Sequence, residues 1–144
     1  MHASPTAPSV ERVIGPPAGM TVHGAAGSSL AVAKAVEYID ANLCEPLQLS
    51  AIAAVACMSR CHFARLFRHQ VGVSPMEYQR LRRIERARHL LRKDGRRIGQ
   101  IATDLGFYDQ SHFVRWFRRT LGCTPTAYAR AARPLVCEPA DGAA

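Results

Sequence analysis

The sequence predicts an all-α fold of about seven helices, with two helix-turn-helix subdomains joined by a long central helix. Apolar residues recur with the 3.6-residue period of an amphipathic helix, and no segment alternates in the way a half-buried strand does. Two stretches, 52–78 and 101–128, have nearly the same sequence. Residue types that begin and end helices (Ser, Asp, Pro and Gly) occur at corresponding places in both copies. The chain therefore contains one small helical unit twice.

The two copies differ in length by one residue. Ile52-Ala53 matches Ile101-Ala102 at a spacing of 49 residues. The later matches have a spacing of 50 residues, and they pair His62-Phe63, Arg65, Phe67-Arg68, Gly72, Pro75 and Tyr78 with His112-Phe113, Arg115, Phe117-Arg118, Gly122, Pro125 and Tyr128. The extra residue is therefore expected in the turn of the second unit, where an insertion costs least. Two copies are too few for a solenoid, so we interpret them as a duplicated binding head.

The chain begins and ends with segments that lack a helical pattern. Residues 1–28 are rich in Pro, Gly, Ala and Ser, and they predict a disordered leader or linker. Residues 134–144 predict a disordered tail. The first helix is expected over 30–43, with Leu30 facing inward, Ser29 as its N-cap and Pro46 beyond its end.

The first helix-turn-helix is predicted over about 50–72. Ser50 is expected to cap its short helix, which reaches Cys57. Ser59 then caps a longer helix, and Gly72 suits the left-handed position that ends it.

A long linker helix is predicted over about 74–92, where Ser74 provides an N-cap and Pro75 suits the first helical position. A turn at Asp94-Gly95 follows it. Its 19 residues span about 28 Å, and successive major grooves on one face of DNA lie about 34 Å apart. A rigid helix of this length can hold two heads near one turn of duplex apart, and any mismatch with straight DNA requires the duplex to bend.

The second helix-turn-helix is predicted over about 98–122. Its short helix is expected over 98–105, Asp109 caps the longer helix, and Gly122 ends it. The Thr-Pro pair at 124–125 starts the last helix as Ser-Pro starts the linker helix.

Positive charge is concentrated in the repeats and the segment between them. The chain has a net charge of +8, and residues 59–133 carry 17 Lys or Arg against five acids. Seventeen of the 19 basic residues are Arg, whose planar fork suits phosphates and guanine edges better than Lys does. A solvated basic surface is the plainer explanation, but such a surface usually mixes both signs. The charge distribution therefore favours a nucleic-acid partner.

The second helix of each unit is the predicted DNA-reading element, because in a helix-turn-helix it enters the major groove while the first helix braces it. The 3.6-residue spacing of this helix places its aromatic residues on the inward face and a second stripe of residues on the outward face. The outward residues are the candidate DNA-binding residues: Arg60, Cys61, Ala64, Arg65 and Arg68 in the first unit, and Gln110, Ser111, Val114, Arg115 and Arg118 in the second. Arg can bind guanine, Gln can read adenine, and small apolar groups can touch a thymine methyl. For Cys61, Ala64 and Val114, an equally open alternative is that these small side chains only let the helix approach the DNA closely and read no base.

Several side chains near these helices have a structural and a functional interpretation. The aromatic residues could stack on single-stranded bases, but their helical spacing favours core packing; they are Phe63, Phe67, Phe113, Trp116 and Phe117. His62 and His112 lack partners for metal ligation, and we expect their side chains to bond the backbone or a phosphate. The linker arginines either contact phosphates or stay solvated, and they are Arg80, Arg82, Arg83, Arg86, Arg88 and Arg92.

The cysteine pattern predicts no chemistry. Five cysteines without regular spacing are expected to be reduced thiols packed as small apolar residues: Cys44, Cys57, Cys61, Cys123 and Cys137. There is no C-x-x-C motif and no catalytic dyad, so no metal, cofactor or enzyme activity is predicted. No apolar run is long enough for a signal peptide or a membrane span, which predicts a cytoplasmic, nucleoid-associated protein without a membrane partner.

Residues 29–133 resemble the DNA-binding domain of the AraC/XylS family of bacterial transcription regulators. The second unit reads I-A-x-x-L-G-F-x-D-Q-S-H-F-x-R-x-F-R-R-x-x-G-C-T-P-x-x-Y, which is close to that family's motif. Residues 75–91 also fit its linker pattern, P-x-x-Y-x-x-x-x-R-x-x-x-A-x-x-L-L. The first unit departs from the motif at Cys57-Met58, where the second has Gly106-Phe107.

The resemblance implies a seven-helix fold that binds an asymmetric promoter site and usually activates transcription through RNA polymerase. It also implies base contacts by Arg60, Cys61, Ala64 and Arg65 in one head, and by Gln110, Ser111, Val114 and Arg115 in the other. Many family members carry an effector-binding and dimerisation domain before this one, and 28 residues are too few to form it. We therefore expect either a stand-alone regulator or a fragment of a longer one, and a monomer on DNA if the chain is complete.

The leading hypothesis is a sequence-specific double-stranded DNA-binding transcriptional regulator, acting as an activator through two recognition helices in successive major grooves. One alternative is a non-specific nucleic-acid-binding protein, which would show a steep salt dependence without sequence preference. The other is a regulator that responds to a small effector, or to oxidation of the thiol of Cys57 or Cys61.

Overall fold

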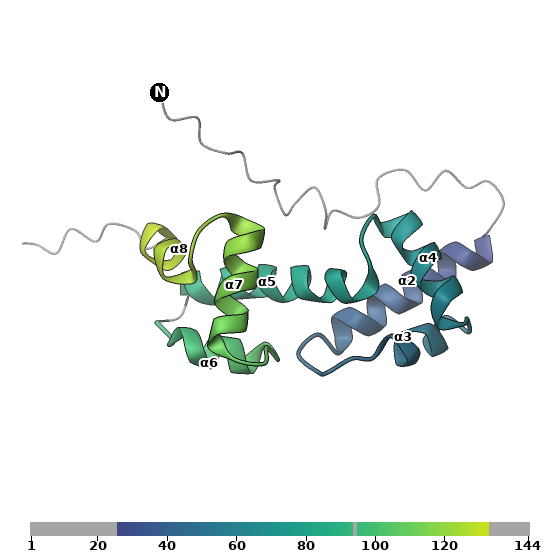
Figure 1. Cartoon of the computed structure of the whole chain (residues 1–144), viewed down its shortest axis with the longest axis horizontal. Helices are drawn as coiled ribbons and strands as arrows, with labels where there is room; N and C mark the ends of the chain where they lie inside the picture. The colour runs from purple at the N-terminus through teal and green to yellow at the C-terminus, as the bar shows by residue number, and fades with distance from the viewer. Residues whose placement is uncertain (1–25, 94, 133–144) are drawn as a thin grey trace, which may run out of the picture.

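Seven helices and no strand are present in residues 26–93 and 95–132, which are the residues that the computed structural model describes (Figure 1). In chain order they are α2 (Ala26–Ala41), α3 (Leu49–Val55), α4 (Arg60–Val71), α5 (Pro75–Lys93), α6 (Ile98–Asp104), α7 (Gln110–Leu121) and α8 (Pro125–Ala132). The predicted all-α fold is confirmed. Asp94, Cys137, the predicted tail and the predicted leader up to residue 25 lie outside the described residues.

The long helix α5 runs between two helical clusters and contributes to the core of each (Figure 1). Helices α2, α3 and α4 pack around its first half, where Tyr78 is buried beside Phe67. Helices α7 and α8 pack on its second half, with α6 against α7, and there Ile84 is buried in one cluster with Phe117. Because one helix belongs to both cores, it sets the distance between the two heads.

The predicted helix ends of the two recognition helices agree with the structure. Ser59 and Asp109 cap α4 and α7 by accepting from the backbone N–H three residues later, at 3.3 and 2.7 Å. Gly72 and Gly122 end these helices in the left-handed region, with φ of 94° and 78°. The Ser-Pro and Thr-Pro pairs begin α5 and α8 with caps of the same kind. Each such cap contributes about 1 kcal/mol to stability.

The extra residue of the second unit lies in the predicted turn. Four residues separate α3 from α4, whereas five separate α6 from α7. Tyr108 is in the longer connection and is 93% exposed, so the insertion leaves the surrounding core unchanged.

Two predicted N-caps are wrong. Helix α2 begins at Ala26, so Ser29 lies inside it. Helix α3 begins at Leu49, so Ser50 is its second residue. The N-cap residue is Gln48, and its side chain makes no capping hydrogen bond. A Ser inside a helix can direct its hydroxyl elsewhere, so a nearby Ser does not by itself define where a helix starts.

The predicted inward position of Leu30 on α2 is wrong. Leu30 was expected to face inward, but it is 57% exposed. Val32, Ala35 and Ile39 are buried instead, and at 100° per residue Leu30 lies on the side of the helix opposite to them. The helix ends at Ala41, before the predicted end.

No helix among residues 26–93 and 95–132 has both the length and the apolar character needed to cross a lipid bilayer.

Candidate nucleic-acid interface

The predicted DNA-reading residues of the second unit lie together on the outer face of α7. They line an open surface hollow of about 840 Å³, and its lining consists of Gln110, Ser111, Val114, Arg115, Arg118 and Arg119. Except for half-buried Val114, these side chains are exposed. None of them makes a hydrogen bond or ion pair to another described residue, so their donors are free for a partner.

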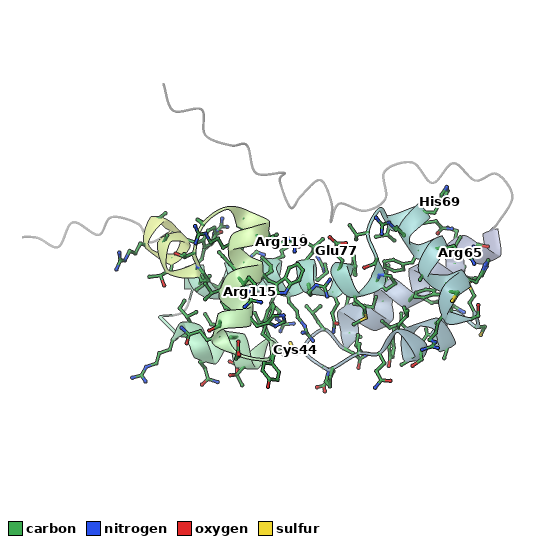
Figure 2. The ribbon with its side chains drawn as sticks, in the orientation of Figure 1. Cys44, Arg65, His69, Glu77, Arg115 and Arg119 are labelled. Carbon is green, nitrogen blue, oxygen red and sulfur yellow. The ribbon has the colours of Figure 1, made fainter. Side chains whose placement is uncertain are left out.

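The first unit presents the corresponding face of α4. Arg60, Cys61, Arg65 and Arg68 are exposed, and Ala64 is half-buried. Successive positions in this set are one, three or four residues apart, and this spacing keeps their side chains on one side of the helix. Figure 2 shows Arg65 on α4 and Arg115 on α7, far apart along the molecule. The predicted DNA-binding residues therefore form two separate faces, one on α4 of the first head and one on α7 of the second.

The recognition helices are held in place by aromatic cores. Phe63, Phe67, Phe113 and Phe117 are fully buried, and each adjacent pair of rings lies 5.5 to 5.6 Å apart. These four side chains are therefore core residues rather than stacking platforms, as predicted.

Trp116 departs from the predicted core position because it is only half-buried. The guanidinium carbons of Arg80 and Arg119 lie 4.4 and 5.1 Å from its ring centroid, distances at which a cation is attracted to an aromatic face. The indole N–H donates to Nε2 of His112 at 2.9 Å. Nε2 of His112 thus bonds a side chain rather than the backbone, and the expected phosphate contact stays a prediction.

Arg119 was missed by the sequence analysis, although a simple signal was available. It follows Arg115 by four residues, and residues four apart lie on the same face of a helix. The corresponding position of the first unit is His69, which is also exposed.

Arg83 on the linker helix is neither solvated nor available to a phosphate. The residue is 8% exposed, and its guanidinium donates to the carbonyl oxygens of Leu43, Glu45 and Gly106 at 2.7, 2.9 and 2.8 Å. Burial lowers the pKa of Arg83, but the hydrogen bonds to three carbonyl oxygens offset the cost of removing the charged guanidinium from water. Since Leu43 and Glu45 follow α2 whereas Gly106 precedes α7, this one side chain joins the two heads.

Other linker arginines are also used inside the protein. Arg82 pairs with Asp40 at 3.0 Å and with Glu85 at 3.1 Å, which ties α5 to α2. Arg88 and Arg92 lie over the ring of Tyr128, at 5.9 and 5.7 Å from its centroid. Exposed Arg86 is the linker arginine that fits the expected solvated position.

The cysteines differ from their predicted environment. The four described cysteines are free thiols, but only Cys44 and Cys123 are half-buried; Cys57 and Cys61 are exposed. Cys61 lies on the outer face of α4, and Cys57 lies in the turn before it with φ of 54°. Within the described residues, no group of three His, Cys, Asp or Glu side chains is arranged to hold a metal ion.

Comparison of the sequence with known proteins gives a consistent family. A family model described as a helix-turn-helix domain matches residues 52–131. The regulatory protein PocR of Salmonella typhimurium is 34% identical over 94 residues, which cover 65% of this chain and 31% of PocR. The arabinose operon regulatory protein of Escherichia coli is 30% identical over 80 residues, 55% of this chain and 27% of that protein. The chain spans 20–31% of the length of such curated relatives.

Solved structures show the same fold. A transcriptional regulator from Chromobacterium violaceum, described as containing an AraC-type DNA-binding domain, superposes with a TM-score of 0.69 at 33% identity, covering 76% of this chain and 98% of that one. The DNA-binding domain of the global transcriptional factor AdpA, solved in complex with a target DNA, superposes with a TM-score of 0.68 at 32% identity, covering 72% and 93%.

Proposed function

The chain belongs to the AraC-type family of helix-turn-helix transcriptional regulators, which bind double-stranded DNA, and from this premise we propose how it reads its site. Helices α4 and α7 enter successive major grooves on one face of an asymmetric promoter site. One chain, associated with the nucleoid, occupies one site with its two heads and activates transcription through contact with RNA polymerase.

One observation carries this proposal: the arginines of the two outer faces have free donors, whereas three of the six linker arginines, Arg82, Arg83 and Arg88, use their donors inside the protein. Arg65 on α4 and Arg115 on α7 are exposed and make no hydrogen bond to a described residue. A guanidinium that is not already paired can bind the O6 and N7 atoms of guanine with two parallel hydrogen bonds. The neighbouring arginines Arg60, Arg68 and Arg118 are placed for backbone phosphates or for bases at the edge of each contact.

The faces also differ in ways that support an asymmetric site. The first head presents Arg60, Cys61 and Ala64 where the second presents Gln110, Ser111 and Val114. An amide side chain favours adenine, and small apolar side chains favour a thymine methyl, so unlike faces select unlike half-sites.

The decisive experiment is selection of bound duplexes from a random pool at physiological salt. We expect enrichment of two unlike half-motifs about one helical turn apart. A palindrome would instead show that two chains each use one head. Affinity without any enriched sequence, together with a steep salt slope, would overturn sequence-specific binding in favour of a general nucleic-acid-binding protein.

The exposure of Cys61 on the first reading face favours a second candidate, regulation by thiol oxidation. A bulky or charged adduct at this position would block entry of α4 into the groove. DNA affinity should then fall on oxidation of the parent protein and stay constant in the Cys57→Ser, Cys61→Ser double variant. Equal affinity of both proteins before and after oxidation would remove this candidate.

A further inference from the structure

Trp116 forms a platform at the junction of α7 and α5. Its ring contacts two guanidinium groups, Arg119 from its own helix at 5.1 Å and Arg80 from α5 at 4.4 Å. The hydrogen bond from its indole N–H to His112 fixes the plane of the ring. Two positive groups from different helices therefore lie against one aromatic side chain.

Neither guanidinium has a counter-charge within the described residues. Arg80 is half-buried, and its Nε atom is buried without a hydrogen-bond partner among them. Arg119 lines the hollow on α7 and makes no ion pair. Glu77, a carboxylate one turn before Arg80 on α5, forms no ion pair with it. Two cations that lie against one ring without a paired anion favour binding of a negatively charged group there.

We propose that Arg80 and Arg119 clamp one phosphate of the DNA backbone beside the groove that α7 occupies. This proposal rests on the proposed function, because α7 must lie in the major groove. Arg119 lies one helical turn beyond Arg115 on the same face, which brings it toward the edge of the groove where the phosphates are. Arg80 approaches from the first half of the linker helix, the half around which the first head packs. Guanidinium forks match phosphate oxygens in shape and charge.

The first head has no equivalent of this clamp. Leu66 and His69 occupy the positions that correspond to Trp116 and Arg119, and a Leu side chain offers no aromatic face to a guanidinium. The clamp therefore acts on one side of the site only. It anchors the second head and helps to set the direction in which the chain lies on an asymmetric sequence.

A methylphosphonate scan of the selected duplex tests the clamp, because this substitution removes the charge of one phosphate at a time. We expect one position beside the second half-site at which the neutral group weakens binding of the parent protein about tenfold. In Arg80→Gln and Arg119→Gln, binding to the unmodified duplex should be about tenfold weaker, and the neutral group at that position should have no further effect. Arg86→Gln is the matched control, because it removes an exposed arginine from the same linker helix and should leave both results unchanged.

A second variant separates the platform from a general loss of charge. Trp116→Leu gives the second head the residue found in the first, keeps both arginines, and should also abolish the response at that one phosphate. Each variant should retain its base preference in the second half-site and its helical circular dichroism. If Arg80→Gln and Arg119→Gln respond to the neutral phosphate as the parent does, the clamp is wrong even though the proposed function stands. Absence of any base preference in the parent would instead overturn the proposed function.

Discussion

Arginine side chains serve two purposes in this protein, and their surroundings distinguish them. Arg83 is buried and directs its donors to main-chain oxygens, and Arg82 pairs with Asp40. Arg65 and Arg115 are exposed and retain free donors. Removal of an arginine of the first kind should therefore affect stability, whereas removal of one of the second kind should affect DNA binding alone.

Arg115→Ala tests this distinction. We expect affinity for the selected site to fall by about 1–3 kcal/mol, with relaxed preference at one base, because two hydrogen bonds to a guanine edge are lost. Competition binding against duplexes that vary at each position measures both effects, and thermal unfolding should be nearly unchanged. An equal loss on random DNA would show that Arg115 contacts a phosphate instead.

Tyr78 gives a pH dependence that belongs to stability rather than to binding. Its hydroxyl donates to the Asp40 carboxylate at 3.2 Å, and burial together with the charge of Asp40 raises the pKa of Tyr78 from 10.0 to about 12. Folding therefore favours the neutral phenol. The contribution of the neutral Tyr78 phenol to the free energy of unfolding is complete below pH 10 and is lost as the pH rises through 12.

The corresponding test compares the parent with Tyr78→Phe, which cannot ionise at this position. Between pH 9 and pH 12, the free energy of unfolding should fall by roughly 2 kcal/mol more in the parent than in the variant. Denaturant unfolding at a series of pH values measures the difference, and the comparison cancels the titration of the other tyrosines. Parallel pH profiles for the two proteins would contradict the prediction.

At the scale of the helices, the two turns before the recognition helices use the same backbone conformation with different residues. Cys57 and Gly106 occupy corresponding positions, 49 residues apart, with φ of 54° and 77°. A Cβ atom at Gly106 would collide with the carbonyl oxygen of Cys44. The first head thus tolerates a side chain in the left-handed region, at a cost of about 1–2 kcal/mol, because its turn is exposed and has no such neighbour.

Substitutions at these two positions should have opposite effects. Cys57→Gly removes the strain but adds unfolded-state entropy, so a gain in stability of at most about 1 kcal/mol is expected. Gly106→Ala should lose about 2 kcal/mol or more, since it adds a collision to the strain. Urea unfolding measures both, and a similar change in the two variants would show that the turns are equivalent after all.

At the scale of the whole molecule, Arg83 bonds main-chain atoms of both heads. It bonds the segment after α2 and the turn before α7, and Gln79 adds bonds to Leu43 and Glu45 at 3.2 and 3.0 Å. The heads are thereby attached to each other as well as to the shared helix α5. Such a molecule should tolerate little change in the spacing of its half-sites.

Arg83→Met tests this coupling. Loss of a buried charge that satisfies three carbonyl groups should destabilise the fold by about 2–4 kcal/mol. At a temperature where the variant remains folded, insertion of one base pair between the half-motifs should weaken its binding less than it weakens binding of the parent. The exposed substitution Arg86→Met serves as the control. An identical spacing penalty in parent and Arg83→Met would show that α5 alone orients the heads.

Much of this architecture could be predicted from the sequence because its causes are local. The caps at Ser59 and Asp109 follow from side chains that bond the backbone three residues later, and the core positions follow from helical spacing. The outer faces follow from the same spacing. The carbonyl partners of Arg83 could not be predicted, because they lie 23 to 40 residues away in turns that bring main-chain atoms together. The contact of Trp116 with Arg80 likewise depends on how α5 and α7 pack, which no local pattern records.

The bonds of Arg83 have one further consequence, for how the protein can change. Its acceptors are main-chain carbonyl oxygens, and every amino acid supplies that group. Mutations at Leu43 and Glu45 therefore leave the acceptors in place as long as the backbone keeps its path, whereas Gly106 is restricted by its need to lack a side chain. Over evolutionary time, or in a designed library, exposed positions of these segments such as Glu45 are free to diversify while the relative orientation of the heads is inherited unchanged.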